Sequence, residues 1–311
     1  MKVFLKVLFV IISIFIITEA CICIYDYYTR VDEDSTSVQK DYLFTLESYP
    51  KVDASLATQP LTNAFIKYFT GEENITDEYL DYTNTHPGYI RLIDGDVDLI
   101  VVTEPSEDEL DYAKEKNVEL EVIPVVREGF VFYVNKDNPV SELSLKEIQD
   151  IYSGKITNWK EIGGEDAEIR AFQRPENSGS QTGMLSLVMK DKKLMTPIKE
   201  DLVETMEEII GLVSSYDNGL NSIGYSYYYY ATTMFDVIDS EVADRIKLLA
   251  IDGIEPNNTT IKSEEYPLET AYYIVIRKDE PEESNTRKLV NAMLSKEGQM
   301  VAEEAGYVGV K

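Results

Sequence analysis

The amino-acid sequence predicts an α/β fold with open, mostly parallel sheets. Along residues 40–311, short apolar runs rich in β-branched residues alternate with segments of helical pattern, which is the order expected of βαβ units. The chain has 311 residues, of which 44% are hydrophobic and 28% are charged, so it can form one large domain or two lobes of ordinary size.

Each expected strand is a short apolar run, and each expected helix lies between two such runs. The tyrosine run Tyr227–Tyr230 is interpreted as the edge of a strand or helix, with a structural rather than a functional role. The expected strands are Val97–Thr103, Val118–Val126, Phe130–Asn135, Ile169–Gln173, Ile246–Ile251 and Ala271–Arg277. The expected helices are Leu61–Phe69 after Pro60, Tyr89–Ile93, Glu107–Glu115, Ser144–Ser153, Ser180–Lys190, Thr205–Ser215 and Asn285–Leu294.

The composition argues against several classes of function. The 29 basic and 57 acidic residues give a net charge of −28, whereas a nucleic-acid-binding protein needs a basic face. His86 is the only histidine, and both cysteines, Cys21 and Cys23, lie in the apolar N-terminal segment. We therefore expect no disulfide in the rest of the chain, no zinc site of histidine and cysteine, and no cofactor.

The first residues have the composition of an export signal or a membrane anchor. Lys2 and Lys6 precede the apolar run Val7–Thr18, which continues after Glu19 as Ala20–Tyr25. Counted through Glu19, this run has 19 residues and is just long enough to cross a bilayer.

Two kinds of attachment stay open for this anchor, which we assign to residues 1–28. Cys21 is the candidate for lipid attachment, and the alternative is an uncleaved membrane helix. Residues 29–41 are polar and lack periodicity, so we interpret them as a stalk. Either attachment places the rest of the chain on the extracytoplasmic face of the cell membrane.

Four segments combine the end of a strand-like run or turn with small polar residues and the start of a helix. Such positions bind anions in open α/β sheets, because the first N–H groups of a helix are unpaired and its dipole favours negative charge. Taken singly, each segment also fits an ordinary helix N-cap. The four segments are Asp53–Pro60, Thr83–Gly88, Thr103–Ser106 and Arg174–Thr182.

The last of these segments offers the most donors to an anion. Arg174 supplies a planar charged fork, and Ser178-Gly179-Ser180 combines two hydroxyls with a glycine that lets a ligand approach the backbone.

Three longer strings in the sequence are informative. They are EGFVFYVNKDNP at Glu128–Pro139, IYSGKITNWKEIGG at Ile151–Gly164 and FQRPENSGSQT at Phe172–Thr182. Together with Val97–Ser106, Ile223–Tyr230 and Tyr266–Ile276, these strings resemble the phosphate-binding subunits of bacterial ABC importers. The resemblance implies a two-lobed, type II periplasmic-binding-protein-like fold with two crossing strands and phosphate in the interlobe cleft. Lobe one would comprise residues 42–124 and 256–311, and lobe two residues 125–255.

Carried over onto this chain, the family's anion loop falls on Arg174, Ser178, Gly179 and Ser180, with Ser180 in place of threonine. In the first lobe, its hydroxyl-bearing helix starts fall on Ser55 to Thr58, which includes Ala57, and on Thr85. The resemblance thus implies these residues as phosphate ligands, although Ala54 and Leu56 depart from the Gly-Ser-Thr pattern of relatives.

The family's carboxylate falls on Glu104, where many relatives have aspartate. A carboxylate in an anion site repels its ligand unless the ligand donates a proton to it. Monohydrogen phosphate has such a proton and sulfate has none, so Glu104 is expected to act as a filter against sulfate.

The resemblance implies an extracytoplasmic solute-binding protein, active as a monomer, that captures inorganic phosphate and delivers it to the permease of an ABC importer. A membrane-anchored phosphate sensor or scavenger without a permease stays open as the alternative. A hydrolase is the third reading, but no pair of carboxylates stands in a recognisable acid/base motif.

Overall fold

The computed structural model describes residues 42–73, 80–215, 219–234 and 239–310. The expected anchor with Cys21 and the expected stalk lie outside these residues. Residues 44–311 form one compact unit. Within the described ranges, no helix is long and apolar enough to span a membrane.

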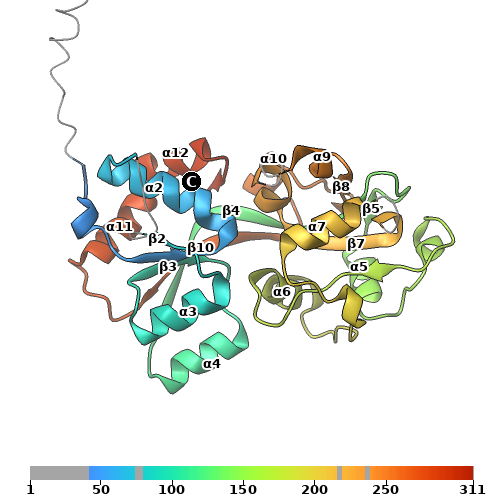
Figure 1. The fold of residues 1–311 in the computed structure, drawn as a ribbon, viewed down its shortest axis with the longest axis horizontal. Coiled ribbons are helices and arrows are strands. Elements are labelled where there is room, and N and C mark those ends of the chain that lie inside the picture. Colours follow the sequence, from blue (N-terminus) through green and yellow to red (C-terminus); the bar gives the residue numbers. More distant parts are fainter. Residues whose placement is uncertain (1–41, 74–79, 216–218, 235–238, 311) are drawn as a thin grey trace, which may run out of the picture. The chain divides into compact units, whose positions relative to one another are not determined.

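The first lobe is built on a sheet with the strand order β2-β1-β3-β10-β4 (Figure 1). β1 is parallel to β2 and β3, whereas β10 is antiparallel to both β3 and β4. Helices α2, α11 and α12 lie on one side of this sheet and α3 and α4 on the other. The strands are β1 (Val52–Ala54), β2 (Leu80–Asp81), β3 (Leu99–Val102), β4 (Leu120–Asn135), β10 (Glu269–Arg277) and β11 (Val308–Gly309).

The second lobe continues the sheet from the far half of β4. β7 and β8 are both antiparallel to this half, and β6 is parallel to β7. The lobes are therefore mixed in strand direction rather than mostly parallel, because β4 is antiparallel to each of its partners. The strands are β5 (Glu142–Leu143), β6 (Arg170–Ala171), β7 (Ser222–Tyr227), β8 (Ile246–Leu248) and β9 (Ala250–Ile251).

β4 joins the two lobes. Two strands were expected here, but residues 120–135 form one strand that pairs with β10 in the first lobe and with β7 and β8 in the second. The residues left between the two expected strands include Glu128, which is 2% exposed. Its carboxylate accepts from the backbone N–H groups of Gly129, at 2.8 Å, and Tyr229, at 3.2 Å. Because burial disfavours its charged form, the pKa of Glu128 is raised to about 8.

Most expected helices are present with small shifts of their ends. The expected helix Ser180–Lys190 is instead a short α-helix, α6, followed by a π-helical segment at Met184–Met189. The helices are α2 (Gln59–Thr70), α3 (Thr85–Asp94), α4 (Glu107–Glu115), α5 (Leu145–Tyr152), α6 (Gly179–Gly183), α7 (Met206–Ser214), α9 (Ser240–Ala243), α10 (Asn258–Lys262), α11 (Asn285–Met293) and α12 (Lys296–Glu304).

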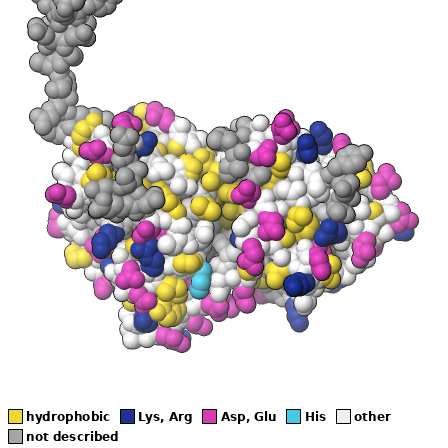
Figure 2. All heavy atoms as spheres, in the orientation of Figure 1, with side chains coloured by type: hydrophobic (Ala, Val, Ile, Leu, Met, Phe, Trp, Pro, Cys, Tyr) yellow, Lys and Arg dark blue, Asp and Glu magenta, His cyan; other side chains and the backbone are white. Residues whose placement is uncertain are grey.

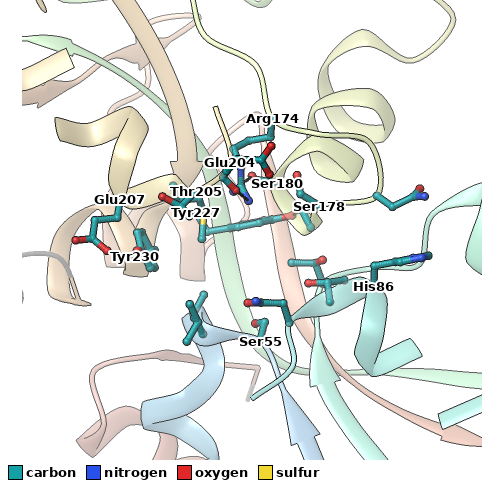
Figure 3. Close-up of a pocket in the computed structure, with 18 of the residues that line it drawn as sticks. Ser55, His86, Arg174, Ser178, Ser180, Glu204, Thr205, Glu207, Tyr227 and Tyr230 are labelled. Atoms are coloured by element: carbon teal, nitrogen blue, oxygen red, sulfur yellow. Dashed lines mark hydrogen bonds between the residues drawn. The ribbon is translucent and has the colours of Figure 1, made fainter. Parts of the chain in front are cut away.

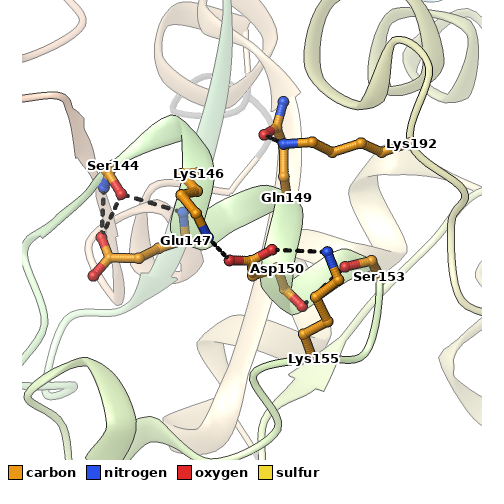
Figure 4. A network of polar contacts seen from close by, with 8 residues as sticks. All are labelled: Ser144, Lys146, Glu147, Gln149, Asp150, Ser153, Lys155 and Lys192. Atoms are coloured by element: carbon orange, nitrogen blue, oxygen red, sulfur yellow. Dashed lines mark hydrogen bonds and ion pairs between the residues drawn. The ribbon is translucent and has the colours of Figure 1, made fainter.

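The string at Ile151–Gly164 has a structural role in the second lobe. Asp150, at the end of α5, accepts from Lys146 and from Lys155, which bracket it along the chain (Figure 4). Trp159 is buried, and its indole N–H donates to the main-chain oxygen of Asn221 at 2.8 Å. The ion pairs fix the end of α5 and the turn after it, and the Trp159 contact joins the following segment to Asn221, just before β7.

The two-lobed α/β fold expected from the sequence is confirmed. The proposed residue limits of the lobes stay a prediction, although the division of β4 between two groups of strands agrees with a crossing in this part of the chain.

Candidate functional site

The two lobes enclose a cavity of about 260 Å³. This volume is below the roughly 300–1,000 Å³ typical of pockets for drug-sized ligands, so the cavity suits a small ligand. Figure 3 shows Arg174, Ser178 and Ser180 on one side of the cavity and Ser55 on the other. The lining residues are Ser55, Leu56, Ala57, Asn84, Thr85, His86, Pro87, Thr103, Arg174, Glu176, Asn177, Ser178, Gly179, Ser180, Glu204, Thr205, Met206, Glu207, Tyr227 and Tyr230.

A buried carboxylate, Asp53, organises the first-lobe side of the cavity. It lies at β1, just before the Ser55 loop, and is fully buried. It accepts from the backbone N–H of Ala54 at 2.7 Å, from the Thr83 hydroxyl at 2.6 Å and from the Arg91 guanidinium at 2.6 Å. Asp53 therefore holds together the loop that carries Ser55 and the loop that leads to α3.

The C-terminal segment supports the same loop from behind. The Tyr307 hydroxyl donates to the main-chain oxygen of Ala57 at 2.7 Å. Its ring stacks on Tyr229, with 3.7 Å between ring centroids, and the Tyr229 hydroxyl donates to the main-chain oxygen of Ala305. The Ser55–Thr58 turn is thus fixed by residues from the far end of the chain.

The second-lobe side is formed by the loop between β6 and α6. The guanidinium of Arg174 donates to the Ser180 hydroxyl at 3.1 Å and to the main-chain oxygen of Glu204 at 2.7 Å. The backbone N–H of Arg174 donates to the Tyr225 hydroxyl at 2.9 Å. These contacts hold the guanidinium against the cavity.

Four helical segments begin at the cavity, and three of them have no side-chain cap on a backbone N–H. The N-cap residues of these three are Ser55, Asn84 and Ser178, and none of their side chains accepts from a first-turn N–H. The fourth is α7, whose N-cap Thr205 accepts from the backbone N–H of Glu208 at 3.1 Å. By contrast, Ser106 and Ser144 at helices away from the cavity form complete capping boxes. The helix starts at the cavity are therefore left with donors for a ligand.

Three buried donors of lining residues have no hydrogen-bond partner among the described residues. They are Nε of Arg174, Oγ of Ser178 and Oγ1 of Thr103. Among the described residues, Arg174 also takes part in no ion pair. Burial lowers the pKa of Arg174, because desolvation penalises a cation that lacks a paired carboxylate. A partly buried cation without an ion pair is costly, and an anionic ligand in the cavity would relieve this cost.

The structure brings together most of the residues expected from the sequence. The expected residues that line the cavity are Ser55, Ala57, Thr85, Arg174, Ser178, Gly179 and Ser180.

Thr58 and Glu104 are not among the lining residues. The Thr58 hydroxyl is buried and donates to the main-chain oxygen of Val101 at 2.5 Å, so its proton is already used. The carboxylate of Glu104 accepts from the Ser186 hydroxyl. The role of Glu104 as a sulfate filter stays a prediction.

Several lining residues were missed from the sequence. Tyr227 and Tyr230 were interpreted as structural, but both line the cavity, and the Tyr227 hydroxyl donates to the main-chain oxygen of Gly179 at 3.0 Å. In a sequence, a run of tyrosines usually indicates core residues. These two tyrosines line the cavity because β7 ends at this point.

Exposed carboxylates also line the cavity. Glu176, Glu204 and Glu207 are all exposed lining residues. They belong to a surface on which acidic side chains are widespread, as Figure 2 shows for one face. Exposed charges are screened beyond roughly 8 Å at physiological salt, so they slow the approach of an anion more than they oppose its contacts inside.

The described residues show no cluster of three or more histidine, cysteine, aspartate or glutamate side chains that could hold a metal ion. His86 lies at the cavity, and its Nδ1 is 2.9 Å from Oε1 of the buried Glu109. Burial raises the pKa of Glu109.

Comparisons with known proteins agree with this geometry. The phosphate-binding protein PstS of Bacillus subtilis (strain 168) is 27% identical over 217 residues, which cover 70% of this chain and 66% of that protein. PstS of Staphylococcus aureus (strain USA300) is 24% identical over 270 residues, which cover 85% of this chain and 79% of that protein.

Solved structures show the same fold. A Clostridium perfringens substrate-binding protein with bound phosphate has a TM-score of 0.65 at 23% identity and covers 84% of this chain and 98% of its own. An ABC-type phosphate transport receptor from Vibrio cholerae has a TM-score of 0.60 at 20% identity and covers 83% of this chain and 98% of its own. The model of the PBP superfamily domain matches residues 47–297, and the chain therefore belongs to the PBP superfamily.

Proposed function

We propose that this chain is a solute-binding protein that captures inorganic phosphate between its lobes and delivers it to an ABC importer. The two relatives named above are phosphate-binding proteins by name, and the cavity has the size and the donors for a small oxyanion.

The unpaired guanidinium of Arg174 carries the proposal. Its Nε has no partner, it takes part in no ion pair of the described residues, and the neighbouring Ser178 hydroxyl also lacks a partner. Two oxygens of a phosphate match the planar fork of an arginine, and such charge-assisted bonds are about twice as strong as neutral ones.

The remaining ligand contacts come from both lobes. We assign them to Ser55, Ala57 and Thr85 of the first lobe and to Ser178, Gly179 and Ser180 of the second. Hydroxyls and first-turn N–H groups supply neutral donors, which suits an anion of more than one protonation state. Thr58 acts indirectly, since its side chain fixes the Ser55 turn through the Val101 oxygen.

We further propose that the chain works outside the cytoplasm, attached to the membrane through residues 1–28, and that it acts as a monomer. The apolar run behind Lys2 and Lys6 supports attachment. Delivery to a permease follows from the activity of the relatives rather than from a contact in this chain.

Calorimetry tests the proposal. The full chain, freed of carried-over phosphate, is titrated with phosphate and with sulfate. Saturable binding of one phosphate per chain is expected, and it should be lost or strongly weakened in Arg174→Ala. A parent protein that takes up no phosphate under these conditions would exclude this function.

A further inference from the structure

Two hydrogen bonds join the first lobe to the second just outside the ligand contacts. Oε1 of Glu104 accepts from the Ser186 hydroxyl, and Oδ2 of Asp108 accepts from the side-chain amide of Asn177 at 2.9 Å. Glu104 precedes α4 and Asp108 lies in its first turn, whereas Asn177 and Ser186 flank α6. In both bonds a carboxylate of the first lobe accepts from a neutral side chain of the second.

The same two segments also carry groups that face the ligand. Thr103, which directly precedes Glu104, lines the cavity, and so does Gly179, which lies between Asn177 and Ser186. The two lobes touch closely here. A β-carbon added to Gly179 would lie 2.6 Å from Oγ1 of Thr103 and 2.7 Å from Oγ1 of Thr85. In this structure these contacts join the two lobes.

We propose that the bonds Glu104–Ser186 and Asp108–Asn177 form a latch that holds the lobes closed and sets how fast the ligand leaves. This inference rests on the proposed function and deepens it. Glu104 is then a positioning residue, which acts on the ligand through lobe closure and not by direct contact.

The placement of the four side chains decides between a latch and a ligand contact. Glu104, Asp108 and Ser186 are not lining residues of the cavity, and only Asn177 is. Loss of Ser186 therefore removes the partner of Glu104 without removing a ligand contact. A bond that exists in the closed state alone slows opening, so its loss should appear in the rate of release.

The test uses the full chain with the variants Glu104→Ala, Ser186→Ala, the double variant Glu104→Ala/Ser186→Ala, and Asp108→Ala. The rate of phosphate release is measured by stopped flow, and the phosphate-to-sulfate affinity ratio by calorimetry. Glu107→Ala is the matched control, because Glu107 is an exposed carboxylate of the same helix turn that takes no part in the latch.

A latch predicts that each single variant releases phosphate roughly three- to tenfold faster, which is the range for one hydrogen bond to a charged group that is partly exposed to solvent. The double variant Glu104→Ala/Ser186→Ala should be no faster than the faster single one, since both remove one bond. The phosphate-to-sulfate ratio should stay unchanged. If Ser186→Ala releases phosphate at the parent rate while Glu104→Ala alters the ratio, Glu104 is a ligand residue and the latch is wrong.

A second measurement follows the closed state directly and does not depend on the rate of release. Hydrogen exchange of the phosphate-saturated protein is followed in the peptides around residues 103–110 and 176–187. Faster exchange in Ser186→Ala and Asp108→Ala, but not in Glu107→Ala, is expected from a latch. Unchanged exchange in both latch variants would overturn the latch, whereas a parent that binds no phosphate would overturn the proposed function on which the latch rests.

Discussion

Replacing Gly179 with alanine should block lobe closure while leaving each lobe intact. The new β-carbon would lie 2.6 Å from Oγ1 of Thr103 and 2.7 Å from Oγ1 of Thr85, both shorter than a van der Waals contact. Both threonines belong to the first lobe, so the clash arises only when the lobes meet. Overpacking of this kind costs roughly 1–3 kcal/mol. Because the cost falls on the closed, ligand-binding state, affinity for phosphate should drop about 5- to 150-fold.

The stability of the open, ligand-free protein should rise in Gly179→Ala, although its affinity for phosphate falls. Gly179 lies at the first turn of α6 with ordinary helical backbone geometry, so alanine fits there and lowers the entropy of the unfolded chain. Gly211→Ala in α7 is the matched control, because no atom lies within 4 Å of its added β-carbon. It should gain stability without losing affinity.

Calorimetry, thermal unfolding and small-angle scattering together test this reasoning. The parent should become more compact with saturating phosphate, whereas Gly179→Ala should compact less and bind more weakly, with an unchanged or raised Tm of the ligand-free protein. Parent-like affinity in Gly179→Ala would refute the closed contact of Gly179 with the two threonines.

Three further predictions concern single side chains. Arg174→Ala should lose roughly 2–4 kcal/mol of phosphate-binding free energy, against about 1 kcal/mol for Ser180→Ala. If calorimetry gives equal losses for the two variants, Arg174 is not the main ligand residue. Arg91→Ala leaves the buried Asp53 without its cation and should lower the free energy of unfolding by about 3–5 kcal/mol. Urea unfolding measures this change, and a loss below about 1 kcal/mol would contradict the prediction. The folded-state pKa of Glu128, about 8, lies above its ordinary value, so its stabilising contribution is complete below that ordinary value and is lost as pH rises to 8. Glu128→Gln should therefore flatten the decline in stability from pH 5 to pH 8, and urea unfolding with a parent-like slope would show that another group titrates.

Local signals in the sequence predicted the helices well. The expected helix Glu107–Glu115 is found with the same bounds, since Ser106 and Glu109 form a capping box that fixes its start. The expected break before Phe130 was wrong. Charged residues in an apolar run suggest a loop, but Glu128 is buried in β4 and bonded by backbone N–H groups that come partly from a segment 101 residues away.

The sequence predicted those parts of the site whose residues are close together along the chain. Arg174 and Ser178 belong to one loop, so the string alone places them near each other. The direction of the Glu104 side chain depends on Ser186, which is 82 residues away, and no local pattern predicts that contact. Asp53 was missed for a similar reason, because its partners Thr83 and Arg91 come from another strand and helix.

The support of Ala57 by Tyr307 affects the order in which the site matures during synthesis. The two residues are 250 positions apart, so the ribosome makes the loop long before its support. A nascent chain that ends just before Tyr307 already contains every residue that lines the cavity. It nevertheless lacks the contact that fixes the first loop, so a chain cut before Tyr307 should bind its ligand more weakly than a chain that contains Tyr307. The first loop should therefore reach its binding geometry only after Tyr307 has been made.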